Sequence, residues 1–430
     1  MARARVSTPL GIFCLAALLR LFVVWLVHDS TQGQPLFPDA QGYDAASATI
    51  ADGIRSGGIP SPHDLAGIVG SQVWGYPAVM ALAKVMSSGG WLSAKLLLAL
   101  IGASSAPAAY LLAHASGTTS RRALSVGLLI AASPSLILFD AWGLKDALVV
   151  SILLWSLLVI VKARFWVACI ATLISVQTLL YVRPIAALFV LAALLVRVRV
   201  RSRYFAGGVL LAVGCAYVVL PRIAALADLS RSLRIDSSTG FGFTGGPEAT
   251  NLLTHPQYIA TFLFGPYPWA YGPGTQGPQR WLYLGTTVWI AILVLAPASI
   301  RAAWRDSRGM GRPLIAGSVT YGLLYLVSFG GAFYRQRSIL ETTLLLLVVV
   351  YMPASRAAIA SRLSMWLAFV AALALLQSND LSPTLTSKVI ILAVLVALVG
   401  VTLGPVRGRR PMGGLLRRRP LRREHEVSAM

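Results

Sequence analysis

The sequence predicts an all-α membrane protein that crosses the bilayer about twelve times, and three observations lead to that prediction. Of the 430 residues, 57% are hydrophobic and only 12% are charged. Apolar runs of roughly 20 residues, the length that spans a bilayer core, recur along the chain. Short clusters of arginine and lysine separate these runs. A soluble domain would expose too much of this apolar surface, so the chain is expected to lie in a membrane.

Twelve segments are predicted to span the bilayer, with ends that can shift by a few residues. They are residues 9–28, 91–114, 122–139, 146–161, 165–181, 184–196, 204–220, 281–300, 313–331, 339–355, 364–377 and 387–404. Residues 1–404 are therefore expected to form one transmembrane domain. Residues 75–87 are apolar but too short to span, and we expect a re-entrant or interfacial helix there.

The basic clusters set the predicted topology. They fall in every second connection, and the positive-inside rule places those connections in the cytoplasm. Both termini are then cytoplasmic, and the two long connections, residues 29–74 and 221–280, are external loops. Arginine outnumbers lysine 32 to 5 beside abundant alanine and glycine, which indicates a GC-rich bacterial genome and hence a bacterial plasma membrane.

A basic cytoplasmic tail is predicted at residues 405–430. Eight arginines lie between Arg407 and Arg423, directly after a hydrophobic segment. The net charge of +22 would indicate nucleic acid in a soluble protein. Next to a membrane, such a tail is expected to contact anionic lipid head groups instead, so nucleic acid is not an expected partner.

The carboxylates collect on the side opposite the basic clusters. By this topology, 12 of the 15 acidic residues fall at external loops or external helix ends. Chemistry that needs a carboxylate is therefore expected on the outer face. No acid is predicted at the bilayer centre, where an unpaired one costs about 2.5 to 3.5 kcal/mol. Arg20 is the one ionic residue well inside a predicted span, and its simplest expected partner is a polar group on a neighbouring helix.

An amphipathic helix is predicted in the first external loop, lying at the membrane surface. From Tyr43 onward, apolar residues recur at helical spacing, and Gly57 and Gly58 stand where the helix would end. Asp39 lies at or just before its start, and Asp44 in its first turn. Two interpretations are open for these residues: they cap the helix and complement its dipole, or one of them is a general base at the lipid–water boundary.

Further motifs follow this loop in a fixed order. They are WGYPAVMALAKVM at residues 74–86, SPSLILFDAWGLKDALVVSILLW at 133–155, LLYVRPIAALFVL at 179–191 and GGAFYRQRSILETTLLLL at 330–347. Over most of residues 1–355, their order resembles that of the multi-spanning glycosyltransferases with the C-type fold. These family-39-like enzymes belong to the superfamily of the protein O-mannosyltransferases and the aminoarabinose transferases. Several members carry adjacent Asp and Glu in the first loop, whereas Ala40 follows Asp39 here, so a single carboxylate remains for the base.

The resemblance implies transfer of a sugar from a polyprenyl-phosphate-linked donor to an external glycan, lipid or protein acceptor. A carboxylate of the first loop, Asp39 or alternatively Asp44, would take the proton from the acceptor hydroxyl while polyprenyl phosphate leaves with inversion. Such a donor needs no Gly-rich nucleotide-binding loop, and the sequence shows none. No cofactor and no metal site is predicted, because His63 and His255 are isolated, and dependence on a divalent metal stays open.

A departing phosphate needs fixed positive charge, and four basic side chains fall at predicted external helix ends. They are Lys145, Arg183, Arg335 and Arg337. Each has another interpretation. The arginines can snorkel to the interface, Lys145 can form a local ion pair with Asp146 at a helix start, and Glu341, one turn beyond Arg337, can neutralise that arginine.

Two other classes of function fit an outer-face membrane protein. A glycan polymerase or ligase acting on lipid pyrophosphates would also keep external arginines. A transporter or flippase usually shows internal repeats and broken helices with polar groups at the midplane. External acids and unequal long loops favour an enzyme over a transporter.

Overall fold

The computed structural model of the chain confirms the all-α class in the residues that it describes, among which no strand occurs. These residues are 7–33, 35, 38–58, 60–69, 73–87, 90–197, 205–236, 277–306, 309–329 and 337–352. The helices are α1 (Ser7–Ser30), α2 (Pro38–Arg55), α3 (Pro62–Val69), α4 (Gly75–Ser87), α5 (Trp91–Ala103), α6 (Ser105–Ala115), α7 (Ser120–Ala131), α8 (Pro134–Ala141), α9 (Asp146–Lys162), α10 (Phe165–Val182), α11 (Pro184–Arg197), α12 (Phe205–Asp236), α14 (Gly277–Arg305), α15 (Gly311–Phe329) and α16 (Ser338–Tyr351).

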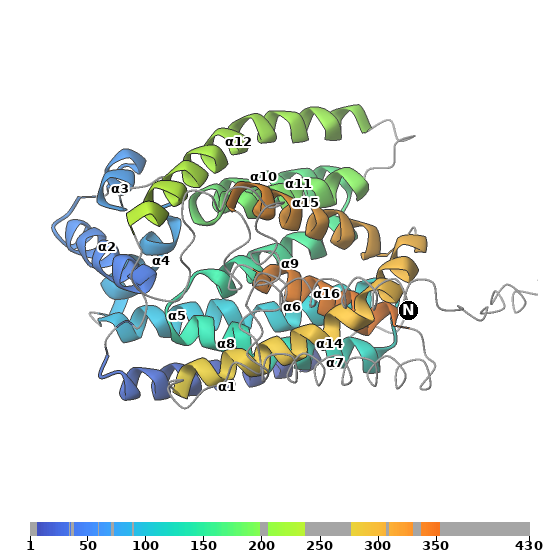
Figure 1. Cartoon of the computed structure of the whole chain (residues 1–430), viewed down its shortest axis with the longest axis horizontal. Helices are drawn as coiled ribbons and strands as arrows, with labels where there is room; N and C mark the ends of the chain where they lie inside the picture. The colour runs from blue at the N-terminus through green and yellow to red at the C-terminus, as the bar shows by residue number, and fades with distance from the viewer. Residues whose placement is uncertain are drawn as a thin grey trace, which may run out of the picture.

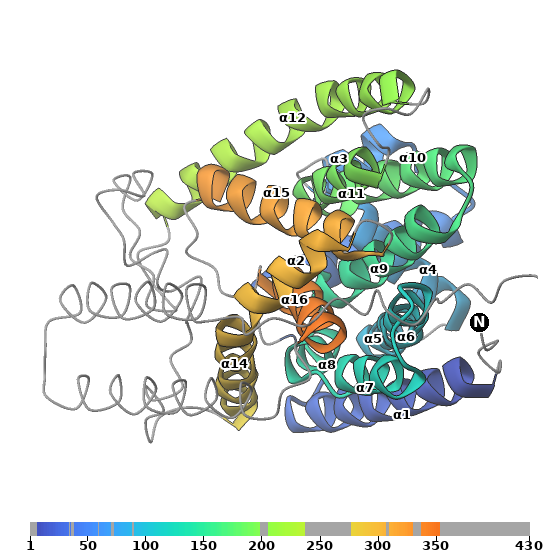
Figure 2. The ribbon, with the colours of Figure 1, turned by 90° about the vertical axis from the view of Figure 1, so that its right-hand side faces the viewer.

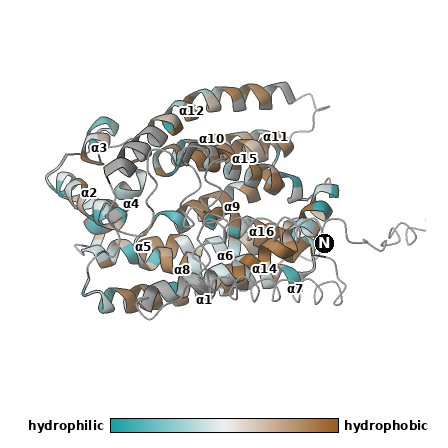
Figure 3. Cartoon of the chain, viewed as in Figure 1, coloured by the Kyte–Doolittle hydropathy of each residue, from teal (hydrophilic) through white to brown (hydrophobic). Residues whose placement is uncertain are grey.

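Five helical segments are long and apolar enough to cross a membrane. They are Ser7–Ser30, Trp91–Ala115, Ser120–Ala141, Phe165–Val182 and Val288–Arg305. Figure 3 shows extended apolar stretches along these bundle helices. The described residues therefore support a membrane-embedded helical protein but not a count of twelve spans. The spans predicted at 364–377 and 387–404, and the tail at 405–430, lie outside the described residues.

One end of the bundle is covered by α2, α3 and α4, which pack on one another and which we call the cap (Figures 1 and 2). Side chains from several helix ends meet below it. The rings of Trp74 and Tyr181 lie 4.4 Å apart, and the guanidinium carbon of Arg222 lies 4.9 Å from the centre of the Tyr181 ring. The start of α4 and the ends of α10 and of the apolar part of α12 therefore share this end, the cap end.

The ends of α6, α14 and α16 and the start of α15 meet at the opposite end of the bundle, which we call the basic end. There Met310 N donates a hydrogen bond of 3.3 Å to Ser116 Oγ, and Tyr351 OH one of 3.0 Å to Asp306. The exposed Lys162 lies at the α9–α10 connection. These helix ends thus lie at the end of the bundle opposite the cap.

The cap helix α2 follows the predicted pattern but begins earlier, because Pro38 suits the first turn of a helix. Ala46 and Ile50, on the predicted apolar stripe, are 8% and 2% exposed. Gly57 has φ +89°, and the backbone N–H of Gly58 bonds to the carbonyl of Gly53 at 3.1 Å. This left-handed glycine ending confirms the predicted stop.

The other two cap helices, α3 and α4, are short, and residues close in the sequence determine where they begin and end. A reciprocal pair of hydrogen bonds starts α3: Ser61 N donates to the Asp64 carboxylate at 2.9 Å, and Asp64 N to Ser61 Oγ at 3.3 Å. The bonds from Ser61 lower the pKa of the Asp64 carboxyl. The next helix, α4, has the bounds predicted for the interfacial segment and packs on α2 and α5.

The second long loop is shorter in the structure than predicted. α12 continues through Pro221 to Asp236, and α14 already begins at Gly277. Proline in a helix interior removes one hydrogen bond and bends the helix, which neighbouring contacts can tolerate, so Pro221 does not end α12. Residues 237–276 lie outside the described residues.

We expect the cap end to face outward, and cysteine labelling tests this. In a variant without the native cysteines, Ala45→Cys on the exposed side of α2 should react with an impermeant thiol reagent in intact cells. Lys162→Cys at the basic end should react only after permeabilisation. Labelling of Lys162→Cys with protection of Ala45→Cys would reverse the predicted topology.

Candidate functional site

The candidate site lies at the cap end, where α4 packs on α5 and α10 and the α8–α9 turn reaches α2. The rings of Tyr43 in α2 and Tyr76 in α4 meet edge to face with centres 5.0 Å apart. Lys145, which precedes α9, lies with Nζ 5.6 Å from the centre of the Tyr43 ring. A cation over an aromatic face is attracted to it, so this contact fastens the α8–α9 turn to the cap.

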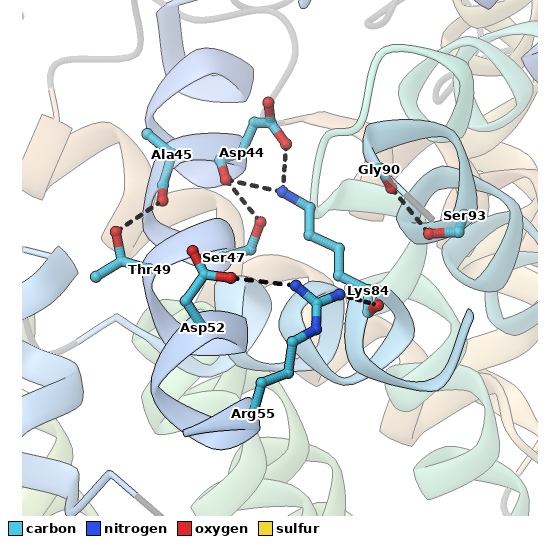
Figure 4. A network of polar contacts seen from close by, with 9 residues as sticks. All are labelled: Asp44, Ala45, Ser47, Thr49, Asp52, Arg55, Lys84, Gly90 and Ser93. Atoms are coloured by element: carbon cyan, nitrogen blue, oxygen red, sulfur yellow. Dashed lines mark hydrogen bonds and ion pairs between the residues drawn. The ribbon is translucent and has the colours of Figure 1, made fainter. Parts of the chain in front are cut away.

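Asp44 joins the two longer cap helices (Figure 4). Lys84 Nζ of α4 donates to Asp44 Oδ1 at 2.5 Å and to the Asp44 backbone carbonyl at 3.0 Å. Arg55 extends the link, because its guanidinium donates to the Lys84 carbonyl at 2.7 Å and to Asp52 at 3.1 Å. The Lys84 side chain is only 7% exposed, so Asp44 compensates a buried charge. These contacts favour a structural role for Asp44.

Asp39 has a different environment from Asp44. It lies within the first turn of α2, one position further into the helix than the sequence indicated, and its side chain is exposed. The next residue, Ala40, is fully buried against the bundle. The carboxylate therefore stands at the edge of the cap, within reach of a molecule approaching the cap end, and it also complements the helix dipole.

Arg183 forms a buried ion pair below the cap. Its guanidinium donates to Asp146 Oδ1 at 2.8 Å, with the side chains 7% and 0% exposed. Asp146 is the first residue of α9, so the pair joins the start of α9 to the end of α10. The sequence did not indicate this bond, because Arg183 and Asp146 belong to different helices; the local pair of Lys145 with Asp146 stays a prediction.

Arg337 is also held by its surroundings. Nε donates to Glu341 at 2.7 Å, which confirms the predicted neutralisation one turn away, and a second nitrogen donates to Thr286 Oγ1 at 2.9 Å. Its guanidinium carbon lies 5.5 Å from the centre of the Trp289 ring. Arg337 therefore joins α14 to α16, while Arg335 lies outside the described residues. The phosphate-binding role of Arg183, Arg335, Arg337 and Lys145 stays a prediction.

Arg20 contacts a polar group on a neighbouring helix, which is the type of partner that the sequence predicted. It forms an ion pair with Asp140 of α8, and the two side chains are 0% and 1% exposed. A second guanidinium nitrogen lies 3.4 Å from Ser105 Oγ. Asp140 was expected at an external helix end, but the turn after it is buried as well, with Trp142 only 3% exposed. α8 packs against α1, α5 and α14, which is why Asp140 lies in the interior.

Two buried lysines were missed by sequence reasoning. Lys84 and Lys95 are 6% and 1% exposed and lie in apolar segments, α4 and the second turn of α5. Burying a lysine is costly without compensation, so a lysine inside an apolar run is the signal that could have found them. Among the described residues, no group of three or more His, Cys, Asp and Glu side chains is arranged to hold a metal ion.

Comparison of the chain with protein-family models, with curated proteins and with solved structures found no match. The class of protein is therefore defined by the chain's own fold and site. It is a membrane-embedded all-α protein with surface helices over one end of a bundle. Carboxylate, basic and aromatic side chains gather under and around those helices.

Proposed function

We propose that the chain is a C-type-fold glycosyltransferase that transfers a sugar from a polyprenyl-phosphate-linked donor to an external acceptor. Twelve spans, cytoplasmic termini and an active site on the outer face of a bacterial plasma membrane belong to the proposal. One observation supports it most: the cap carries an exposed carboxylate, Asp39, over a bundle end that is rich in basic and aromatic side chains. Acceptor activation and carrier-phosphate binding need these groups on one side of a membrane.

In the proposed reaction, Asp39 accepts the proton of the acceptor hydroxyl. The hydroxyl oxygen forms a bond to the anomeric carbon, and the bond from that carbon to the phosphate oxygen breaks on the opposite face. Polyprenyl phosphate leaves with the electron pair, and the anomeric configuration inverts. Asp44 is the weaker candidate for the base, because its carboxylate is held by Lys84 at 2.5 Å in the link between α2 and α4.

Positive charge at the cap end would stabilise the leaving phosphate. Lys145 and Arg183 lie at the α8–α9 and α10–α11 connections, next to the cap. A guanidinium has five N–H donors, so an arginine that holds a carboxylate can still donate to a phosphate oxygen. Arg337 would act from the α14–α16 side. Tyr43, which is partly exposed, offers apolar ring surface of the kind on which sugars stack.

Comparison of envelope glycans tests the proposed function. Cells with and without the gene should differ by one sugar on an envelope glycan, lipid or protein, measured by mass spectrometry. The purified protein with polyprenyl-phosphate-linked sugar should then transfer that sugar to the acceptor from the deletion strain. Identical glycans in both strains, with an altered distribution of carrier lipid between leaflets, would favour the flippase alternative and contradict the proposal.

A further inference from the structure

Buried basic side chains in the described part of the chain are paired, with one exception. Five such side chains are less than 9% exposed: Arg20, Lys84, Lys95, Arg183 and Arg337. Four of them form ion pairs with carboxylates. Lys95, which is 1% exposed, forms no ion pair and no hydrogen bond with the described residues. Its ammonium meets the face of the Trp91 ring, with Nζ 5.5 Å from the ring centre, but no carboxylate of the described residues binds it, so this exception needs an explanation.

Lys95 lies where a ligand at the cap end would meet it. It is the fifth residue of α5, about 6 Å along the helix from its first residue at 1.5 Å per residue. α5 packs on α4 of the cap and on α1. Nζ lies 5.5 Å from the centre of the Trp91 ring one turn earlier, and its ionisable neighbours are Asp44 and His28. The position is therefore close to the predicted membrane surface, just inside the cap.

Two neighbours of Lys95 have buried hydrogen-bonding atoms without a partner among the described residues. These are Nε1 of Trp91 and Nδ1 of His28, in the last turn of α1. The indole nitrogen can only donate, and the histidine nitrogen donates in one tautomer. Three groups around the junction of α1 and α5 can thus supply hydrogen bonds to an acceptor.

The local charges indicate that this acceptor is an anion. Lys84 and Lys95 carry two positive charges, and the Asp44 carboxylate, which is held by Lys84, carries one negative charge. Lys95 is therefore the buried cation of this junction that no carboxylate of the described residues binds, since Asp29, which acts on His28, is exposed. A phosphate oxygen would both neutralise the Lys95 charge and accept hydrogen bonds from several donors at once. An uncharged sugar hydroxyl would leave the charge unbalanced.

We propose that Lys95 binds a phosphate group beneath the cap, with the indole N–H of Trp91 and the imidazole of His28 as further contacts. The inference rests on the proposed function in one respect: the phosphate belongs to the polyprenyl carrier. Binding of a phosphate by Lys95 does not itself require sugar transfer. Lys95 would be a further phosphate-binding residue. Unlike Arg183 and Arg337, it is a buried cation that is not paired with a carboxylate.

Binding to the purified full-length protein in detergent tests this site. Polyprenyl phosphate, inorganic phosphate and uncharged polyprenol are titrated while tryptophan fluorescence and the melting temperature are followed. Lys95→Met should raise the Kd for polyprenyl phosphate about tenfold or more, because a charge-assisted hydrogen bond is lost. The variant should fold, because an apolar side chain of similar size suits a buried position.

Lys162→Met is the matched control, because it removes an exposed lysine at the basic end and should leave the Kd unchanged. A second outcome is that Lys95→Met weakens the binding of inorganic phosphate and leaves the binding of polyprenyl phosphate unchanged. That result would support a phosphate site and contradict the carrier lipid as the source of the phosphate. An unchanged Kd for both phosphates in folded Lys95→Met would overturn the inference. If Lys95→Met still transfers sugar and binds the donor with wild-type affinity, the site is contradicted and the proposed function is not.

Discussion

Asp39→Asn is expected to reduce sugar transfer about 100- to 10,000-fold, the usual loss when general-base assistance is removed. Asparagine keeps the size of the side chain and can still accept a hydrogen bond from a helix N–H, so the start of α2 should survive. What the amide cannot do is accept the acceptor's proton. The measurement is turnover of the purified variant with polyprenyl-phosphate-linked sugar, alongside its membrane level and melting temperature.

The control for Asp39→Asn is Asp52→Asn. Asp52 lies on the same helix, its side chain is 74% exposed, and its ion pair with Arg55 is local. The substitution removes the same charge from the cap and should change turnover less than about twofold, since exposed ion pairs contribute little. Asp44→Asn is a poorer control, because it leaves the buried Lys84 without its carboxylate. Near-normal turnover of Asp39→Asn would exclude this residue as the base.

Asp140→Ala is expected to cost about 3 to 5 kcal/mol of folding free energy, because it leaves Arg20 as a fully buried, uncompensated charge. Little folded protein should then remain in the membrane. The melting temperature and the yield of monodisperse protein in detergent measure the loss. This effect should exceed that of any single change in the exposed part of the cap, where water screens the charges.

A double substitution separates charge from packing at this pair. Arg20→Met with Asp140→Leu removes both charges and keeps apolar volume, so it should recover most of the lost stability. Gly102→Ala is an independent probe, because its Cβ would lie 2.5 Å from an Asp140 oxygen and 2.8 Å from an Arg20 nitrogen. It should weaken the pair while leaving both charges in place. Wild-type stability of Asp140→Ala would show that the pair does not hold α1 to α8.

Helix positions in the described part of the chain were largely predictable from the sequence, because local patterns determine them. The bounds of α4, the apolar stripe of α2 and its glycine ending all depend on residues within a few turns of one another. The same holds for Arg337 and Glu341, which are neighbours on one helix and were predicted to pair. The end of α12 was not predictable in this way, because whether Pro221 bends or ends the helix depends on its neighbours.

The candidate site was only partly predictable. The sequence indicated a carboxylate at the start of the surface helix and basic side chains at helix ends. It did not indicate that Lys84 would bind Asp44, or that Lys95 would be buried beneath the cap without a carboxylate. Both lysines are single charges in apolar runs, and a run of this kind does not show which side of a helix faces the bundle interior.

By itself, the sequence determined that the chain is helical and that it belongs in a membrane. Only the tertiary structure decided which charges meet. The buried pairs join residues 120, 40 and 37 positions apart in the sequence: Arg20 with Asp140, Lys84 with Asp44, and Arg183 with Asp146. The physical reason is that helix periodicity orients side chains only relative to their own axis. Which helices become neighbours, and at what depth, depends on how their side chains pack together.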